Sequence, residues 1–118
     1  KALDVPWNRL ILGGFSQGAM LAVDLALRAP ENPLGLAILS GNLINASAWA
    51  TLAPRRQGLP FFQSHGIADP ILGFAGARAL ETLLREAGLN GELLSFEGGH
   101  AIPPLVQAAL RDFLNRRL

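Results

Sequence analysis

The segment Gly14-Phe15-Ser16-Gln17-Gly18 most constrains what this chain can fold into. It follows the apolar run Leu10-Ile11-Leu12 and precedes a helical pattern that begins at Gln17. A G-x-S-x-G segment in this context is typical of a strand, a sharp turn and a helix, with the serine hydroxyl raised above the sheet edge. We expect both glycines to clear space for the turn. The alternative is a glycine-rich turn in which Ser16 only caps the helix.

Two other chemically useful side chains, Asp69 and His100, also follow strand-like segments. A serine hydroxyl needs a neighbouring base to become a nucleophile, and that base needs a third group to hold its tautomer. The C-terminal ends of parallel strands share one edge of a sheet, so Ser16, Asp69 and His100 are expected to meet there. Their order along the chain, Ser, Asp, His, is that of α/β-hydrolases.

Each partner of Ser16 has one rival in the sequence. His65, the other histidine of the chain, is the rival base. It lies at the end of a predicted strand, four residues before Asp69, and we interpret it as structural. Glu97 lies only three residues from His100 and would have to fold back to reach it. We therefore favour Asp69 as the acid and His100 as the base.

Strand and helix patterns alternate along the chain, which predicts an α/β fold with a mostly parallel sheet, flanking helices and right-handed crossovers. Apolar residues at helical spacing distinguish the helices from the short apolar strands. The predicted strands are residues 10–14, 36–39, 60–64 and 92–96, and the predicted helices are 17–28, 47–52, 75–87 and 104–117.

Four motifs can be compared with known families: Gly13-Gly14-Phe15-Ser16-Gln17-Gly18-Ala19, Leu39-Ser40-Gly41, His65-Gly66-Ile67-Ala68-Asp69-Pro70 and Gly98-Gly99-His100. Together they resemble the phospholipase/carboxylesterase family, which includes acyl-protein thioesterases and related bacterial carboxylesterases. The resemblance runs from about Leu10 to the C-terminus.

The resemblance implies a role for each matching residue. Ser16 corresponds to the nucleophile, Asp69 to the acid and His100 to the base of a Ser-His-Asp triad. The backbone N–H of Gln17 corresponds to one oxyanion donor. The implied reaction is cleavage of a small-molecule carboxylic ester or thioester through an acyl-enzyme.

The chain departs from the family pattern before Ser16. In the family, an N-terminal half with a His-Gly loop supplies the second oxyanion donor, whereas residues 1–9 contain no His-Gly. We therefore expect residues 1–118 to be the C-terminal half of an α/β-hydrolase domain, and a weak catalyst, since losing one donor costs about 10²–10³-fold in turnover.

Two alternatives remain open. The chain could be a non-catalytic fragment, or another α/β-hydrolase such as a peptidase or a dienelactone-hydrolase-like enzyme. Dienelactone hydrolases typically carry a cysteine nucleophile, and this chain has no cysteine.

Several residues near the strand ends are candidates for substrate contact. Ser40 could contact substrate or cap a turn. The large apolar residues of the intervening loops could line an acyl pocket, although packing is the favoured interpretation; they are Leu43, Trp49, Leu72, Phe74 and Ile102.

Composition narrows the possible partners. The net charge is +1, so no general attraction to nucleic acid or anionic membranes is implied. No apolar run reaches the roughly 18 residues of a membrane span. The absence of cysteine excludes disulfides and thiolate metal sites and fits a cytoplasmic protein. No metal-ligand cluster, phosphate loop or dinucleotide motif is present, so we expect no cofactor.

The predicted strand at residues 10–13 raises the question of assembly. It is apolar on both faces, as expected for the centre of a parallel sheet. As an edge it would expose unpaired backbone groups. We expect the chain to form a homodimer through this edge, to aggregate, or to need its missing N-terminal half.

Overall fold

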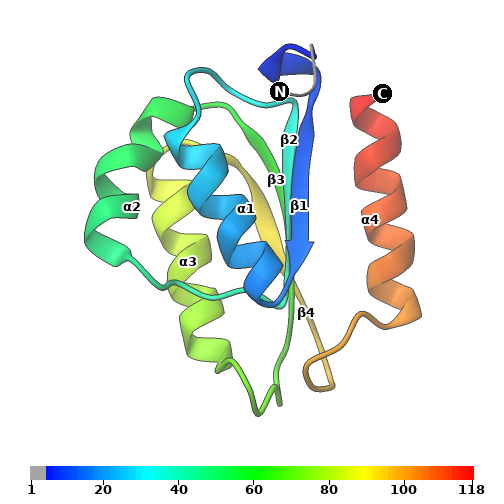
Figure 1. The fold of residues 1–118 in the computed structure, drawn as a ribbon. Helices are drawn as coiled ribbons and strands as arrows, with labels where there is room; N and C mark the ends of the chain where they lie inside the picture. The colour runs from blue at the N-terminus through cyan, green and yellow to red at the C-terminus, as the bar shows by residue number, and fades with distance from the viewer. Residues whose placement is uncertain (1–4) are drawn as a thin grey trace.

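Four parallel strands form a single sheet in the order β1-β2-β3-β4 (Figure 1). The computed structural model describes residues 5–118. Residues 1–4, which belong to the segment 1–9 discussed above, lie outside the described residues. The predicted α/β class is confirmed. The strands are β1 (Ile11–Phe15), β2 (Gly35–Leu39), β3 (Pro60–Gly66) and β4 (Asn90–Phe96).

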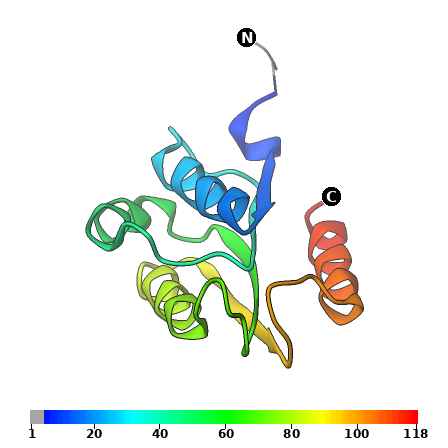
Figure 2. The ribbon, with the colours of Figure 1, turned by 60° about the horizontal axis from the view of Figure 1, so that its bottom comes forward.

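The helices lie on both faces of this sheet. Each strand is added beside the previous one in the same direction, so right-handed crossovers place the intervening helices on one face. Figures 1 and 2 show α1, α2 and α3 on that face and α4 on the other. The helices are α1 (Gln17–Arg28), α2 (Ala46–Leu52), α3 (Phe74–Glu86) and α4 (Pro104–Arg117), with short 3-10 turns η1 (Trp7–Arg9) and η2 (Ala53–Arg56).

The bounds of the elements follow the sequence pattern closely. Helices α1 and α4 begin and end at the predicted residues. Strands β3 and β4 are longer than predicted because they pair in register over seven residues, from Pro60 with Asn90 to Gly66 with Phe96. Helix α3 begins one residue early, so Phe74 lies on a helix and not on a loop as expected.

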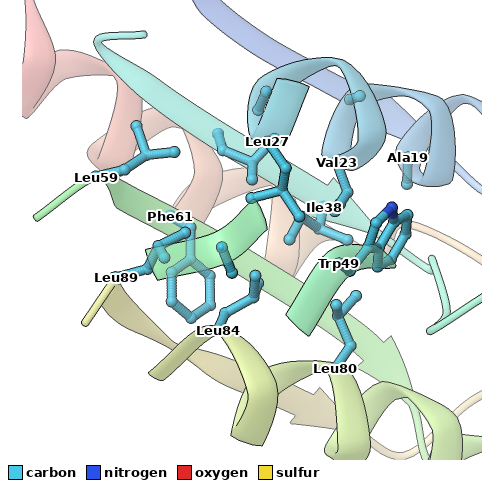
Figure 3. Packing of buried hydrophobic residues seen from close by; sticks show 14 residues of the cluster. Ala19, Val23, Leu27, Ile38, Trp49, Leu59, Phe61, Leu80, Leu84 and Leu89 are labelled. Carbon is cyan, nitrogen blue, oxygen red and sulfur yellow. The ribbon is translucent and has the colours of Figure 1, made fainter. Parts of the chain in front are cut away.

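The main core lies between the sheet and helices α1–α3 (Figure 3). Trp49 of α2 is fully buried in it, and its indole N–H donates a hydrogen bond to Asp24 Oδ1 at 3.0 Å. A buried indole usually finds such an acceptor. A smaller cluster on the α4 side contains Leu39, Phe96 and Val106. The sheet is therefore packed against buried side chains on both faces.

Strand β1 is one edge of the sheet. The Leu10 carbonyl accepts the Leu34 N–H, and the Ser16 N–H donates to the Leu39 carbonyl, so these peptide groups face β2. Along a strand, the N–H and C=O of successive residues point to alternate sides. The N–H and C=O of Ile11 and Gly13 therefore face the open edge. Within residues 5–118, no helix is both long and apolar enough to cross a membrane.

We propose that residues 1–118 on their own self-associate through the open edge of β1. Sedimentation velocity at several concentrations should show a dimer or larger species. Ile11→Pro should weaken association, because proline removes an outward N–H and blocks edge pairing without breaking a bond to β2. A wild-type chain that stays monomeric at every concentration and melts cooperatively would contradict the prediction.

Candidate active site

Ser16 lies in a strained turn between β1 and α1. Its φ of 59° and ψ of −120° are rarely adopted by a residue with a side chain and typically cost 1–3 kcal/mol. The surrounding bonds hold this conformation: the Ser16 N–H donates to the Leu39 carbonyl at 2.8 Å, and the Ser16 carbonyl accepts the Ala19 N–H at 3.0 Å. The hydroxyl makes no capping bond to α1, so the capping alternative is wrong.

The two glycines of the turn have different roles. A side chain at Gly14 would overlap the backbone of Gly18, so only glycine fits at position 14. A side chain at Gly18 would meet nothing within 4 Å. The expectation that both glycines clear space for the turn is therefore correct for Gly14 and wrong for Gly18.

The structure brings Ser16, His100 and Asp69 into one hydrogen-bonded chain. His100 Nε2 lies 2.8 Å from Ser16 Oγ, and His100 Nδ1 lies 2.8 Å from Asp69 Oδ2. The Asp69 carboxylate is fully buried, while 18% of the His100 side chain is exposed. The Ser16 and His100 side of this hydrogen-bonded triad is therefore partly exposed, while the Asp69 carboxylate is shielded from water.

The Asp69 carboxylate is fixed by the backbone that follows it. Oδ1 accepts the Ile71 N–H at 2.8 Å and the Leu72 N–H at 2.9 Å, which leaves Oδ2 for His100. Burial by itself raises the pKa of Asp69, but the hydrogen bonds from Leu72, His100 and Ile71 outweigh it and hold the pKa below its ordinary value. The carboxylate is thereby kept ionised beside His100.

The loops that carry Asp69 and His100 are bonded to each other. The Ile67 N–H donates to the Phe96 carbonyl, and the Ala68 N–H donates to the Gly98 carbonyl, both at 2.9 Å. A side chain at Gly66 would overlap the backbone at Gly98. This close backbone contact sets the separation of the two loops and hence of the two side chains.

Three residues around the site have contacts or burial that the sequence alone does not specify. The Phe15 ring lies 4.8 Å from the His100 ring, centroid to centroid. Ser40 is fully buried with a φ of 54°, and its hydroxyl donates to the Ala101 carbonyl at 3.5 Å, beside His100. His65 is fully buried beneath the Asp69 loop. Phe15, Ser40 and His65 each lie within one of the four sequence motifs, which is the only sign in the sequence that they are near the site.

The remaining candidates lie in different surroundings. Glu97 is exposed, and the carboxylate in contact with His100 is that of Asp69. Ile102 packs against the smaller core cluster. The apolar side chains of the predicted pocket occupy several environments: Leu43 packs on the main core and borders a groove between α2 and α3, Leu72 is half-buried, and the Phe74 ring lies 6.2 Å from that of His65.

The start of α1 offers N–H groups next to Ser16. The Ala19 and Met20 amides donate to the Ser16 carbonyl. The amides of Gln17 and Gly18 belong to the first turn, where N–H groups have no acceptor within the helix. A negative oxygen forming on a carbon bonded to Ser16 Oγ would lie near these donors and the positive end of the helix dipole. The arrangement is chemically suited to acyl transfer.

Comparison with known proteins identifies the family of this chain. The sequence profile of the phospholipase/carboxylesterase family matches residues 1–118. Acyl-protein thioesterase 1 of Neurospora crassa is 32% identical over 118 residues, covering 97% of this chain and 48% of that protein. A probable carboxylesterase of Oryza sativa subsp. japonica is 30% identical over 116 residues, covering 97% of this chain and 51% of that protein.

Solved structures agree as well. The crystal structure of Arabidopsis thaliana SOBER1 matches with a TM-score of 0.85 at 28% identity, over 97% of this chain and 55% of that one. The chain spans about half the length of the curated relatives it matches. The strained serine turn, the parallel sheet and the profile match over all 118 residues lead to one conclusion: the chain belongs to the phospholipase/carboxylesterase family of α/β-hydrolases.

Proposed function

We propose that this chain carries the catalytic centre of a serine hydrolase that cleaves carboxylic esters or thioesters. The observation that carries the proposal is the hydrogen-bonded chain from Ser16 Oγ through His100 to Asp69, with both contacts at 2.8 Å. A nucleophile, a base and a group that orients the base stand in the order that acyl transfer requires.

In the acylation step, His100 Nε2 accepts the proton of Ser16 as Oγ attacks the substrate carbonyl carbon. Asp69 holds the other ring nitrogen and stabilises the charged imidazole that forms. The Gln17 N–H stabilises the oxygen that becomes negative. When the tetrahedral intermediate collapses, the bond to the alcohol or thiol breaks and the leaving group takes the proton from His100.

Deacylation repeats these steps with water. His100 removes a proton from a water molecule as its oxygen attacks the acyl carbon bound to Ser16 Oγ. Collapse of the second intermediate releases the carboxylic acid, and Ser16 Oγ takes its proton back from His100. The cycle consumes one water and returns every protein group to its starting state.

Replacing the nucleophile tests the proposal directly. A fluorophosphonate probe should add once to the full chain, as seen by intact mass, and Ser16→Ala should abolish the adduct. Ser47→Ala is the matched control, because Ser47 is an exposed serine on α2 and should leave labelling unchanged. Full labelling of Ser16→Ala would refute the assignment of Ser16. No labelling of the folded wild-type chain would instead favour the non-catalytic fragment.

A second pair of variants identifies the triad acid. Asp69→Asn should lower the rate of ester hydrolysis by roughly 10³–10⁴-fold, because the amide favours the wrong tautomer of His100. Glu97→Gln should leave the rate nearly unchanged, since Glu97 is exposed. The comparison is made on initial rates with a chromogenic ester. Equal losses in the two variants, or a loss only in Glu97→Gln, would overturn the role proposed for Asp69.

The proposed substrate class follows from the relatives, whose names describe an acyl-protein thioesterase and a carboxylesterase. A panel of small esters, acyl thioesters and peptides should show hydrolysis of the first two and not the third. Cleavage of peptides alone would instead favour a peptidase of the same fold. The candidate pocket residues Ser40, Leu43, Leu72, Phe74 and Ile102 are then tested by their effect on acyl-chain preference.

A further inference from the structure

His65 is a buried polar side chain with no part in the acyl-transfer steps. None of its side-chain surface is exposed, and it lies on β3, where it pairs with Ser95 of β4. Its Nε2 lies 2.7 Å from the Leu72 carbonyl oxygen and 3.4 Å from Asp69 Oδ2. Its Nδ1 is buried and has no hydrogen-bond partner among the described residues.

These contacts determine which nitrogen carries the proton. A carbonyl oxygen only accepts hydrogen bonds, so the short contact to Leu72 requires a hydrogen on Nε2. The nearby Asp69 Oδ2 is also an acceptor, which reinforces this tautomer. In the neutral ring, which carries one N–H, Nδ1 is then the nitrogen without a hydrogen.

The backbone of Leu72 links His65 to the acid of the site. Its N–H donates to Asp69 Oδ1 at 2.9 Å, and its carbonyl accepts from His65 at 2.7 Å. The same histidine nitrogen lies against Oδ2, the oxygen that faces His100. His65 is therefore linked to the carboxylate through the Leu72 backbone and lies 3.4 Å from Oδ2. The link begins on a strand, which fixes positions more tightly than a loop.

We propose that His65 is a positioning residue that keeps Asp69 Oδ2 directed at His100 Nδ1. It acts through its Nε2–H on the carbonyl of Leu72, whose N–H holds the other oxygen of the carboxylate. The inference rests on the proposed function, since it concerns how the triad is held. It assigns to His65 more than the filling of space, because the orientation of His100 depends on the position of Asp69.

Two polar substitutions separate this role from simple packing. In His65→Gln the side-chain nitrogen can reach the place of Nε2, whereas in His65→Asn it reaches only the place of Nδ1, which has no partner. The second-order rate constant for fluorophosphonate labelling of Ser16 is measured on folded protein. His65→Asn should lower it, by up to about 10²-fold if the carboxylate shifts by an ångström, and His65→Gln should keep most of it.

Nuclear magnetic resonance supplies readouts that do not depend on turnover. The chain has histidines only at positions 65 and 100, so ¹⁵N-histidine labelling reports on these two rings. In the wild-type chain, the His65 proton should be found on Nε2. The downfield proton between His100 Nδ1 and Asp69 should persist in His65→Gln and broaden or disappear in His65→Asn.

The possible outcomes are distinct. If His65→Asn lowers the melting temperature but keeps the labelling rate and the downfield proton, His65 only fills space and the proposal is overturned. If neither variant folds, the tautomer in the wild-type chain decides, and a proton on Nδ1 overturns the proposal. If the wild-type chain is not labelled at all, the proposed function fails, while the downfield proton in the variants still tests the positioning role.

Discussion

Parallel pairing of four strands in sequential order is the constraint on which the candidate site depends. The register aligns Phe15 with Leu39 and Gly66 with Phe96, so the residues that follow these strands emerge at one edge of the sheet. Ser16 and His100, which are 84 residues apart in the chain, thereby come within 2.8 Å. A register slip of one residue in any strand would turn its side chains to the opposite face and separate these groups.

Backbone strain at two neighbouring strand ends follows from the same arrangement. Ser16 and Ser40 both have positive φ, at 59° and 54°. Each donates its N–H to a carbonyl of the next strand, Ser16 to Leu39 at the end of β2 and Ser40 to Ser64 within β3. The ladder thus continues one residue beyond each strand and then allows a sharp turn. One turn presents the Ser16 hydroxyl, and the other supports the loop beside His100.

Much of this organisation could be predicted because it follows from periodic patterns. The apolar spacing in α1 and α4 predicted their bounds. Because Ser16, Asp69 and His100 each follow a predicted strand, the sequence also indicated that they would share one edge of the sheet. Contacts between loops could not be predicted in this way. The Phe15 ring on His100 and the bond from His65 to the Leu72 carbonyl depend on loop conformations that carry no period. The open space at Gly18 was missed for a similar reason, since a motif does not say which of its glycines is crowded.

The central claim is that Ser16 carries the acyl group during turnover. The most direct measurement is the intact mass and peptide map of the full chain quenched with acid while it hydrolyses a small ester. The account predicts one added acyl group on the peptide that contains Ser16, with the group absent in Ser16→Ala. Hydrolysis at an undiminished rate by Ser16→Ala, or an acyl group on another residue, would contradict it.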